Sequence, residues 1–306
     1  MPITMNTIKT TMLAIIIVNF KNEDKTISYI QNEIVKVDVP NIVVIVNNSA
    51  TSESDNTLTT GLQSELVIDI TKNPAKNSRF VVSHPENLGY AKGNNLGVEF
   101  AIKHFDITHI LITNNDIRFI SNNVVKSLIN KLDSLNNIAI IGPKVIGLDG
   151  KNQSPEPYVP FWNRYIWMYW ITPFLPSNKK VKLFKLDYSQ LATEGVHYKV
   201  MGSFFIIKKS DFVSCGMMDT NTFLYGEEVI LSERLNAIGK KVYYFPDVTV
   251  LHEHGQTISN HLDAKRRKLN QFLSESYYYS TYRKVSNLSI LIGKFSLNCY
   301  IKMKKV

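Results

Sequence analysis

The chain has 306 residues, of which 44% are hydrophobic, and a formal net charge of +9 at pH 7. This length and composition favour a soluble globular protein with one large core or two modest ones. Cys215 and Cys299 are far apart and lack a C-x-x-C or Cys/His ligand spacing, which excludes a disulfide framework and a thiolate metal site. We expect a cytoplasmic protein, because the tail 1–11 shows no signal-peptide pattern and the apolar run 12–18 is too short to span a membrane.

Strand-like and helix-like segments alternate over the first half of the chain. Aliphatic and β-branched runs predict strands over residues 14–18, 42–46, 110–113 and 138–141. Helical periodicity lies between them, near residues 24–35, 94–104 and 123–132. The alternation predicts an α/β fold with a mostly parallel central sheet flanked by helices.

Polar side chains follow three of the predicted strands. They are Asn19, the pair Asn47 and Asn48, and the pair Asn114 and Asp116. Ligands of open α/β sheets bind beyond the carboxyl ends of the strands. We therefore expect these residues to border a ligand site.

An Asn- and Gly-rich segment, NLGYAKGNN, precedes the helix predicted near residue 94. Glycines let the backbone approach a ligand, and the start of a helix offers N–H groups to phosphate or sugar oxygens. The candidate ligand-binding residues are Asn87, Gly89, Gly93, Asn94 and Asn95. The spacing matches neither the dinucleotide-binding G-x-G-x-x-G pattern nor a P-loop, and a plain turn leading into the helix is the alternative.

Residues 154–185 are rich in proline and tryptophan and show little periodicity, which predicts a long surface excursion. Trp162, Trp167, Tyr169 and Trp170 could form a surface that stacks a sugar or meets a membrane interface. An aromatic minicore under the loop is the alternative. We expect the choice of acceptor to depend on this segment.

Residues 201–255 place acids and histidines at the ends of regular elements. Helical periodicity follows the adjacent acids Glu227 and Glu228, and Gly239 is placed to end that helix. The next segment, KVYYFPDVTVLHEHG, predicts a strand that ends at His252 and His254. Function is therefore expected at the acid pair and at the histidines.

Residues 265–306 carry ten Lys or Arg against one acid, Glu275, and so account for the whole net charge. Tyrosines and the apolar string LSILIGKFSLNCYIKM are interleaved with these charges, a composition suited to an anionic membrane surface. Nucleic acid is a competing partner but is not expected, because the chain has no nucleic-acid-binding motif. In a further alternative, Leu288, Leu291, Ile292 and Phe295 pack a final helix onto the domain.

Five segments resemble, in order, the family 2 glycosyltransferases of the GT-A fold, especially the rhamnosyltransferase-like branch that builds bacterial surface polysaccharides. The segments are LAIIIVNFKNEDKTISYIQNEI, NIVVIVNNSATSES, NLGYAKGNNLGVEFA, HILITNNDIRF and the stretch 201–255. Five matches in order are hard to obtain by chance. The resemblance implies a GT-A nucleotide-diphospho-sugar transferase domain over residues 12–260, with a basic, amphipathic, helical extension over 261–306.

The resemblance implies a divalent cation, Mg²⁺ or Mn²⁺, held by Asp116 and His252 beside the donor diphosphate. Asp116 matches the last residue of an Asp-x-Asp-like motif, in which this chain has Asn114 and Asn115 first. One strong anionic ligand therefore remains, and an amide at Asn114 can orient the sugar. His254 is an alternative ligand, and the capping of a turn is an alternative role for Asp116.

Glu228 matches the second acid of the family's Glu-Asp pair, which implies the general base of an inverting reaction, with Glu227 in support. Two adjacent carboxylates repel, which raises one pKa toward the working range. Stabilisation of a helix N-terminus by both acids is the alternative. Asn47, Asn48 and Ser49 match the nucleotide-recognition positions, and an asparagine can read uracil or thymine.

The implied reaction moves a sugar, with rhamnose from dTDP-rhamnose as the candidate, to a lipid-linked saccharide acceptor. The enzyme would lie peripherally at the inner face of the cell membrane, bound through residues 265–306. The alternatives are a UDP-hexose or UDP-galactofuranose transferase on the same scaffold and a non-catalytic nucleotide-sugar-binding partner. The latter is considered because Asn47, Asn114 and Glu228 depart from the family pattern.

Overall fold

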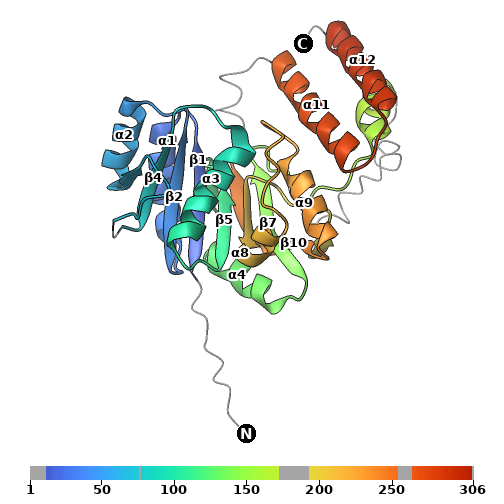
Figure 1. Cartoon of the computed structure of the whole chain (residues 1–306). Helices are drawn as coiled ribbons and strands as arrows, with labels where there is room; N and C mark the ends of the chain where they lie inside the picture. Colours follow the sequence, from blue (N-terminus) through green and yellow to red (C-terminus); the bar gives the residue numbers. More distant parts are fainter. Residues whose placement is uncertain (1–11, 76, 172–192, 254–263, 305–306) are drawn as a thin grey trace.

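The computed structural model describes residues 12–75, 77–171, 193–253 and 264–304. Its strands are β1 (Leu13–Asn19), β2 (Asn41–Asn48), β3 (Glu65–Val67), β4 (Arg79–His84), β5 (His109–Thr113), β6 (Ile117–Phe119), β7 (Ile138–Gly147), β8 (Gly195–His197), β9 (Phe204–Lys208) and β10 (Lys241–His252). They form one sheet in the order β3-β4-β2-β1-β5-β9-β7-β10-β6, and β8 pairs with β10 (Figure 1).

The sheet is parallel around its first strands and mixed beyond them. β1 pairs in parallel with β2 and β5, and β4 pairs in parallel with β2 and β3. β9 runs antiparallel between β5 and β7, whereas β7 and β10 are parallel to each other. The strands predicted from apolar runs are all present, as β1, β2, β5 and β7, because side chains on both faces of these strands are buried.

Helices cover both faces of the sheet. They are α1 (Glu23–Asn32), α2 (Ser52–Leu62), α3 (Gly89–His104), α4 (Val124–Ser134), α8 (Lys209–Ser214) and α9 (Glu227–Ala237), with a 3₁₀ turn η1 at Ile34–Lys36. The core on one face contains side chains of α3, α8 and α9, and the core on the other contains those of α1, α2 and α4. The predicted mostly parallel α/β architecture is thus confirmed.

The helix predicted near residue 94 begins earlier, at Gly89, so the prediction that Gly93, Asn94 and Asn95 precede it is wrong. Glycines inside this helix permit close packing rather than a turn. A Cβ atom on Gly97 would lie 2.8 Å from Ile16 Cγ2 of β1. At the helix start, Gly89 has a φ of +77° and a Cβ there would lie 2.2 Å from the Phe223 carbonyl oxygen.

Two long helices, α11 (Ala264–Thr281) and α12 (Asn287–Lys304), lie side by side beyond α9 (Figure 1). Together with Ile230 of α9 and the aromatic segment before residue 171 they enclose a third core. In that segment, residues Asn163–Trp167 form a π-helical turn, η2, and Met168–Trp170 form α5. The described C-terminal residues are therefore helical, as expected.

The described part of the aromatic segment 154–185 contains both a buried aromatic cluster and exposed tryptophans, so each of the two predicted alternatives holds for some of its residues. Phe161 and Tyr165 are buried in the third core, whereas Trp162 and Trp167 are each 42% exposed. Trp170 donates from Nε1 to Ser296 Oγ at 2.7 Å. Residues 172–185 of the predicted excursion, and His254, lie outside the described residues.

The expectation that Leu288, Leu291, Ile292 and Phe295 pack the final helix onto the domain is wrong, because all four are exposed. The opposite face of α12, with Leu297 and Ile301, fills the third core instead. Within the described ranges, no helix combines the length and the apolar character that a membrane crossing requires.

Two acidic residues, Asp219 and Glu275, connect α11 to other parts of the chain. Asp219 accepts hydrogen bonds from the hydroxyls of Tyr277 and Tyr282, at 2.9 and 2.5 Å. On the α11 side, Glu275 pairs with Arg164 at 2.7 Å. Ser274 Oγ of α11 also donates to the Leu224 carbonyl at 2.8 Å. These contacts hold α11 against the loop that leads into α9.

Candidate active site

Asn19 and Asn47 lie at the carboxyl ends of β1 and β2, and both side chains are buried. Asn19 Nδ2 donates to Asn47 Oδ1 at 3.0 Å, and Asn47 Nδ2 donates to Ser54 Oγ and to Asp55 Oδ1, both at 2.8 Å. Thr26 donates its hydroxyl proton to Asn19 Oδ1 at 2.7 Å. The network ties the strand ends to α1 and α2, so the Asn47 amide is engaged within the protein.

Asn48 shapes the turn that precedes α3. Its Nδ2 donates to Asn87 Oδ1 at 3.0 Å and to the Gly89 carbonyl at 3.2 Å, while its Oδ1 accepts from the Leu88 N–H at 2.7 Å. Ser49 follows with a φ of +80°. Asn87 itself is exposed. Asn48 therefore positions the backbone at this turn. Of Asn48, Ser49 and Asn87, only Asn87 is exposed to solvent, since Asn48 is buried and Ser49 is half-buried.

Asn94 and Asn95 point into the protein from α3. Asn95 exchanges two hydrogen bonds with the backbone of Met218, at 2.9 and 3.2 Å, and Asn94 Nδ2 donates to the Tyr90 carbonyl at 3.0 Å. A Cβ on Gly93 would lie 3.2 Å from Val18 Cγ2. These residues hold α3 against β1 and against the loop that leads to α9.

Asp116 and His252 come together at the end of the sheet, where His252 pairs with Ile117 across β10 and β6. Asp116 Oδ1 lies 3.4 Å from His252 Nε2. On the other side of the ring, Nδ1 donates to Gln153 Oε1 at 2.9 Å, since a glutamine oxygen can only accept. In the neutral tautomer with the proton on Nδ1, the Nε2 lone pair faces the carboxylate.

Two electron-pair donors facing each other favour a cation between or beside them. Asp116 Oδ1 is buried and has no hydrogen-bond partner among the described residues. A carboxylate oxygen and an imidazole nitrogen oriented by a second hydrogen bond suit Mn²⁺, and carboxylate oxygen suits Mg²⁺. The residues present therefore fit a divalent cation. Among the described residues, no group of three or more His, Cys, Asp or Glu side chains is placed to hold a metal ion.

Glu227 and Glu228 open α9, directly after Gly226, whose φ is +87°. Glu227 is 3% exposed and its Oε1 has no hydrogen-bond partner among the described residues. Burial, with a contribution from the Glu228 charge, raises the pKa of Glu227 to about 8. Glu228 is half-buried. The two acids thus occupy different environments, one buried and one half-buried.

Sequence reasoning missed three residues around the acids: Tyr90, Lys199 and Gly202. Tyr90 donates its hydroxyl proton to the Gly202 carbonyl at 2.7 Å. Burial, then the charges of Glu228, Glu227 and Asp116, raises the Tyr90 pKa well above its ordinary value. The hydrogen bond places the Tyr90 hydroxyl beside Gly202, which itself lies against the Glu228 carboxylate.

Lys199 supplies a positive charge on the same side. Its Nζ lies 2.9 Å from Glu156 Oε1, and its side chain is largely buried. Burial lowers the pKa of Lys199, but Glu156 and Glu228 raise it by more, so the net shift is upward and the lysine is a cation. Tyr90 stands inside the NLGYAKGNN motif and Gly202 inside MGSFF, so each had a neighbouring signal but no spacing that indicated its role.

Gly202 determines where the Glu228 carboxylate lies. A Cβ atom on Gly202 would be 2.0 Å from Glu228 Oε1. We expect Gly202→Ala to lower kcat for sugar transfer about 10- to 100-fold by displacing that carboxylate, with little loss of stability. The measurement is steady-state kinetics together with thermal unfolding. Gly61→Ala is the matched control, because its Cβ would meet Ile27 Cδ1 at 2.6 Å away from the acids; equal kinetic losses in both variants would disprove the positioning role.

The pKa of Glu227 has a consequence for stability. In the unfolded chain the carboxyl ionises at an ordinary pKa near 4.5, whereas the folded protein holds the proton up to about pH 8. Stability from this group is therefore complete below pH 4.5 and is lost as the pH rises through 8. Between pH 6 and pH 9 we expect wild type to lose about 3 kcal/mol more unfolding free energy than Glu227→Gln. Urea unfolding at both pH values measures this, and parallel curves would contradict it.

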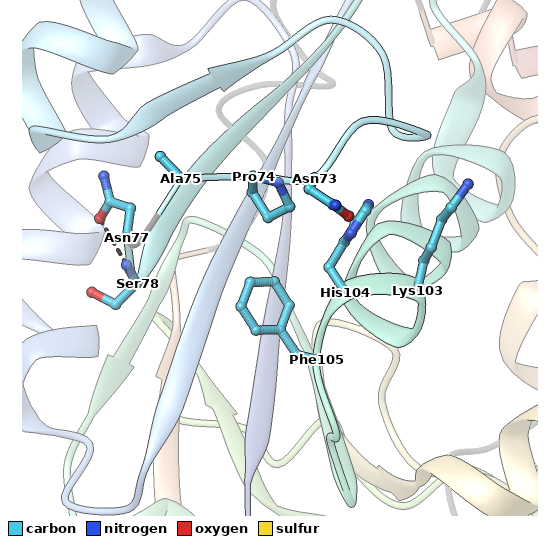
Figure 2. Close-up of a pocket in the computed structure, with 8 residues that line it drawn as sticks. All are labelled: Asn73, Pro74, Ala75, Asn77, Ser78, Lys103, His104 and Phe105. Carbon is cyan, nitrogen blue, oxygen red and sulfur yellow. Dashed lines mark hydrogen bonds between the residues drawn. The ribbon is translucent and has the colours of Figure 1, made fainter.

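A separate cavity of about 770 Å³ lies elsewhere, lined by residues 73–75, 77–78 and 103–105. Figure 2 shows His104 and Phe105, from the end of α3, facing Pro74 of the loop before β4. It opens at the amino ends of the strands, opposite the carboxyl ends that carry the candidate site. The lining of this cavity includes neither the acid pair Glu227 and Glu228 nor the pair Asp116 and His252, so the cavity is not part of the candidate active site.

Comparisons with known proteins agree with this fold. No family model matches the chain. It is 24% identical over 219 residues to the low-salt glycan biosynthesis hexosyltransferase Agl10 of Haloferax volcanii, covering 71% of this chain and 59% of the relative. It is 23% identical over 172 residues to the N-acetylglucosaminyl-diphospho-decaprenol L-rhamnosyltransferase of Mycobacterium tuberculosis, covering 55% of each. The chain thus spans little more than half of these relatives.

Solved structures share the fold at low sequence identity. The mannosyltransferase PcManGT from Pyrobaculum calidifontis, in complex with GDP-Man and Mn²⁺, superposes with a TM-score of 0.56 at 11% identity, over 93% of this chain and 69% of that one. GalNAc-T7 with UDP, GalNAc and Mn²⁺ gives 0.54 at 13% identity, over 90% and 49%. The chain therefore has the fold of the GT-A glycosyltransferases, and its sequence relatives are glycosyltransferases, as the ordered motifs predicted.

Proposed function

We propose that this protein is an inverting, metal-dependent glycosyltransferase that uses a nucleotide-sugar donor. One observation carries the proposal: the chain at Gly202 and Ser203 links the two candidate parts of the site. Gly202 lies against the Glu228 carboxylate, the Ser203 carbonyl accepts from the Asn114 N–H at 2.9 Å, and Asp116, two residues after Asn114, faces His252 at 3.4 Å. The proposed general base and the proposed cation-binding pair would therefore border the same space. The glycosyltransferase relatives and the GT-A fold support this assignment.

Asp116 Oδ1 and His252 Nε2 would hold Mg²⁺ or Mn²⁺. The bound cation supplies charge to offset the negative charge that develops on the leaving diphosphate. Gln153 keeps the His252 ring in the tautomer that presents Nε2. The donor diphosphate would approach the turn before α3, where the Asn87 side chain is exposed. Asn114, whose own N–H donates to the Ser203 carbonyl at 2.9 Å, stays the candidate for orienting the sugar.

Glu228 is the general base in this proposal. The acceptor hydroxyl attacks the anomeric carbon as the bond from that carbon to the diphosphate oxygen breaks, and the hydroxyl proton passes to the Glu228 carboxylate. Attack from the face opposite the leaving group inverts the configuration. Glu227 is too deeply buried to meet an acceptor, and its protonated form at neutral pH leaves Glu228 next to a neutral neighbour.

The acceptor in this proposal is a lipid-linked saccharide at the inner face of the cell membrane. The mycobacterial relative, named for a diphospho-decaprenol acceptor, supports that class. A second cavity, of about 370 Å³, lies between the loop before α9 and α11, lined by Phe223, Leu224 and Leu273 among others. The lining combines these three apolar side chains with the polar residues Asn221, Arg266, Asn270 and Ser274, a mixture that would suit an acceptor with a lipid part and polar groups. Rhamnose from dTDP-rhamnose is the first candidate donor, with a UDP-hexose or UDP-galactofuranose as the alternative.

The experiment is nucleoside diphosphate release from dTDP-, UDP- and GDP-sugars, with Mn²⁺ or with EDTA, in the presence of a prenyl-diphosphate-linked N-acetylglucosamine. We expect release from one donor that depends on the metal and on the acceptor. Binding of a nucleotide without release from any donor would favour the non-catalytic alternative and contradict the proposal. Product stereochemistry tests the inversion, because a retained configuration would exclude the single-displacement step.

A further inference from the structure

We propose that the outward face of α12 is a membrane-docking surface that takes anionic lipid. The face consists of exposed side chains on one stripe of the helix. They are Leu288, Leu291, Ile292, Phe295 and Met303, of which Phe295 and Met303 are 71% and 70% exposed. At 1.5 Å per residue the stripe runs about 22 Å. Scattered single apolar residues are normal on a protein surface, whereas several large ones gathered on one helix face mark an interaction site.

The stripe is held outward by the packing of the opposite face. Leu297 and Ile301 are buried in the third core. A Cβ on Gly293 would lie 2.5 Å from Phe161 Cζ, so α12 contacts the aromatic segment at van der Waals distance there. Rotation of α12 about its axis would bury the stripe only by exposing Leu297 and Ile301, which now fill the third core. The apolar surface is therefore a fixed feature of the folded chain.

Charge decides which partner fits. α12 contains no Asp or Glu, and Lys294 and Lys302 are exposed beside the stripe without an ion pair among the described residues. The lone acid of the tail, Glu275, is on α11 and is paired with Arg164. Leucine and phenylalanine flanked by lysines on a helix parallel to the surface are suited to insertion among lipids with anionic headgroups.

Other occupants fit less well. A second copy docked through the same face would bring the lysines of both chains together with no acid on α12 to offset them. A nucleic acid would use the lysines but would leave the apolar stripe without a contact. α12 meets the membrane as an interfacial helix, since no described helix has the length and apolar character to cross it.

The test uses vesicle flotation of the full chain with phosphatidylcholine alone and with equal parts of phosphatidylcholine and phosphatidylglycerol. Three double variants each lower the net charge by two: Leu291→Glu with Phe295→Glu, Lys294→Gln with Lys302→Gln, and, as the matched control, Ile68→Glu with Leu148→Glu. The control residues are 79% and 69% exposed and lie on the sheet domain. We expect both α12 variants to lose binding to the anionic vesicles about tenfold or more, and the control to float like wild type.

Three results would overturn the proposal: no flotation of wild type, equal flotation on neutral and anionic vesicles, or equal losses in the control and the α12 variants. A wild-type dimer that the α12 variants convert to a monomer would assign the face to a second copy instead. Nucleotide release measured without vesicles is expected to be unchanged in all three variants. Flotation does not depend on catalysis, so failure of the proposed activity and failure of this surface are distinguishable.

Discussion

Glu228→Gln is expected to lower kcat for sugar transfer by about 10²- to 10⁴-fold, because the acceptor hydroxyl loses the group that removes its proton. The KM for the donor is expected to change little, since the substitution preserves size and lies on the acceptor side. Steady-state kinetics with the donor identified by nucleotide release measures both constants. Binding of the nucleoside diphosphate by calorimetry confirms that the variant is folded.

Glu227→Gln is the matched control at the neighbouring position. Its buried carboxyl keeps its proton to about pH 8, so an uncharged amide changes little near pH 7. We expect a loss of less than about tenfold, far below that of Glu228→Gln. A larger loss in Glu227→Gln than in Glu228→Gln would reverse the assignment of the base.

Asp116→Asn is expected to lower the metal-dependent rate by about 10³-fold or more, because the amide removes the carboxylate charge of the proposed cation site. Weaker binding of Mn²⁺ in the presence of the nucleoside diphosphate, followed by calorimetry, gives a readout besides activity. The rate with EDTA is expected to be similar in wild type and variant, since neither then uses the cation.

Asp133→Asn is the control for this experiment. Asp133 Oδ1 lies 3.0 Å from Nε2 of the buried His109, at the start of β5 and far from the acid pair in the fold. It reproduces an Asp–His pair without the proposed metal role. Equal kinetic effects in the two variants, or unchanged Mn²⁺ affinity in Asp116→Asn, would exclude Asp116 as a ligand.

Apolar runs and ordered motifs were sufficient to predict the main sheet strands and the GT-A fold. β1, β2, β5 and β7 are almost continuously hydrophobic, a pattern that only a strand buried on both faces explains at that length. The start of α3 was misplaced, because glycine is a poor helix former and Gly89 and Gly93 read as turn residues. Their role depends on the approach of Phe223 and Val18, which local sequence does not contain.

The sequence named the principal residues of the candidate site but not their supporting contacts. Asp116 and His252 followed from the family motifs, and the sheet brings them within 3.4 Å. Gln153, 99 residues before His252, carries no motif, and its contact exists only once the chain has folded. The stripe on α12 has the same periodicity whether it faces the protein or solvent, so its direction depends on the packing of the opposite face, with Gly293 on Phe161 and with Leu297 and Ile301 in the third core.

The hydrogen bond from Ser274 Oγ of α11 to the Leu224 carbonyl, at 2.8 Å, connects the C-terminal helices to the loop that ends at the acid pair. Ile230, one turn into α9, is buried in the core that α11 and α12 complete. We therefore expect the first turn of α9 and the two C-terminal helices to unfold as one cooperative unit. Amide protons of α9 and α11 would then exchange with solvent through the same opening event. A truncated protein that lacks residues 265–306 would lose the contacts that hold the start of α9. We therefore expect the truncation to change the positions of Glu227 and Glu228.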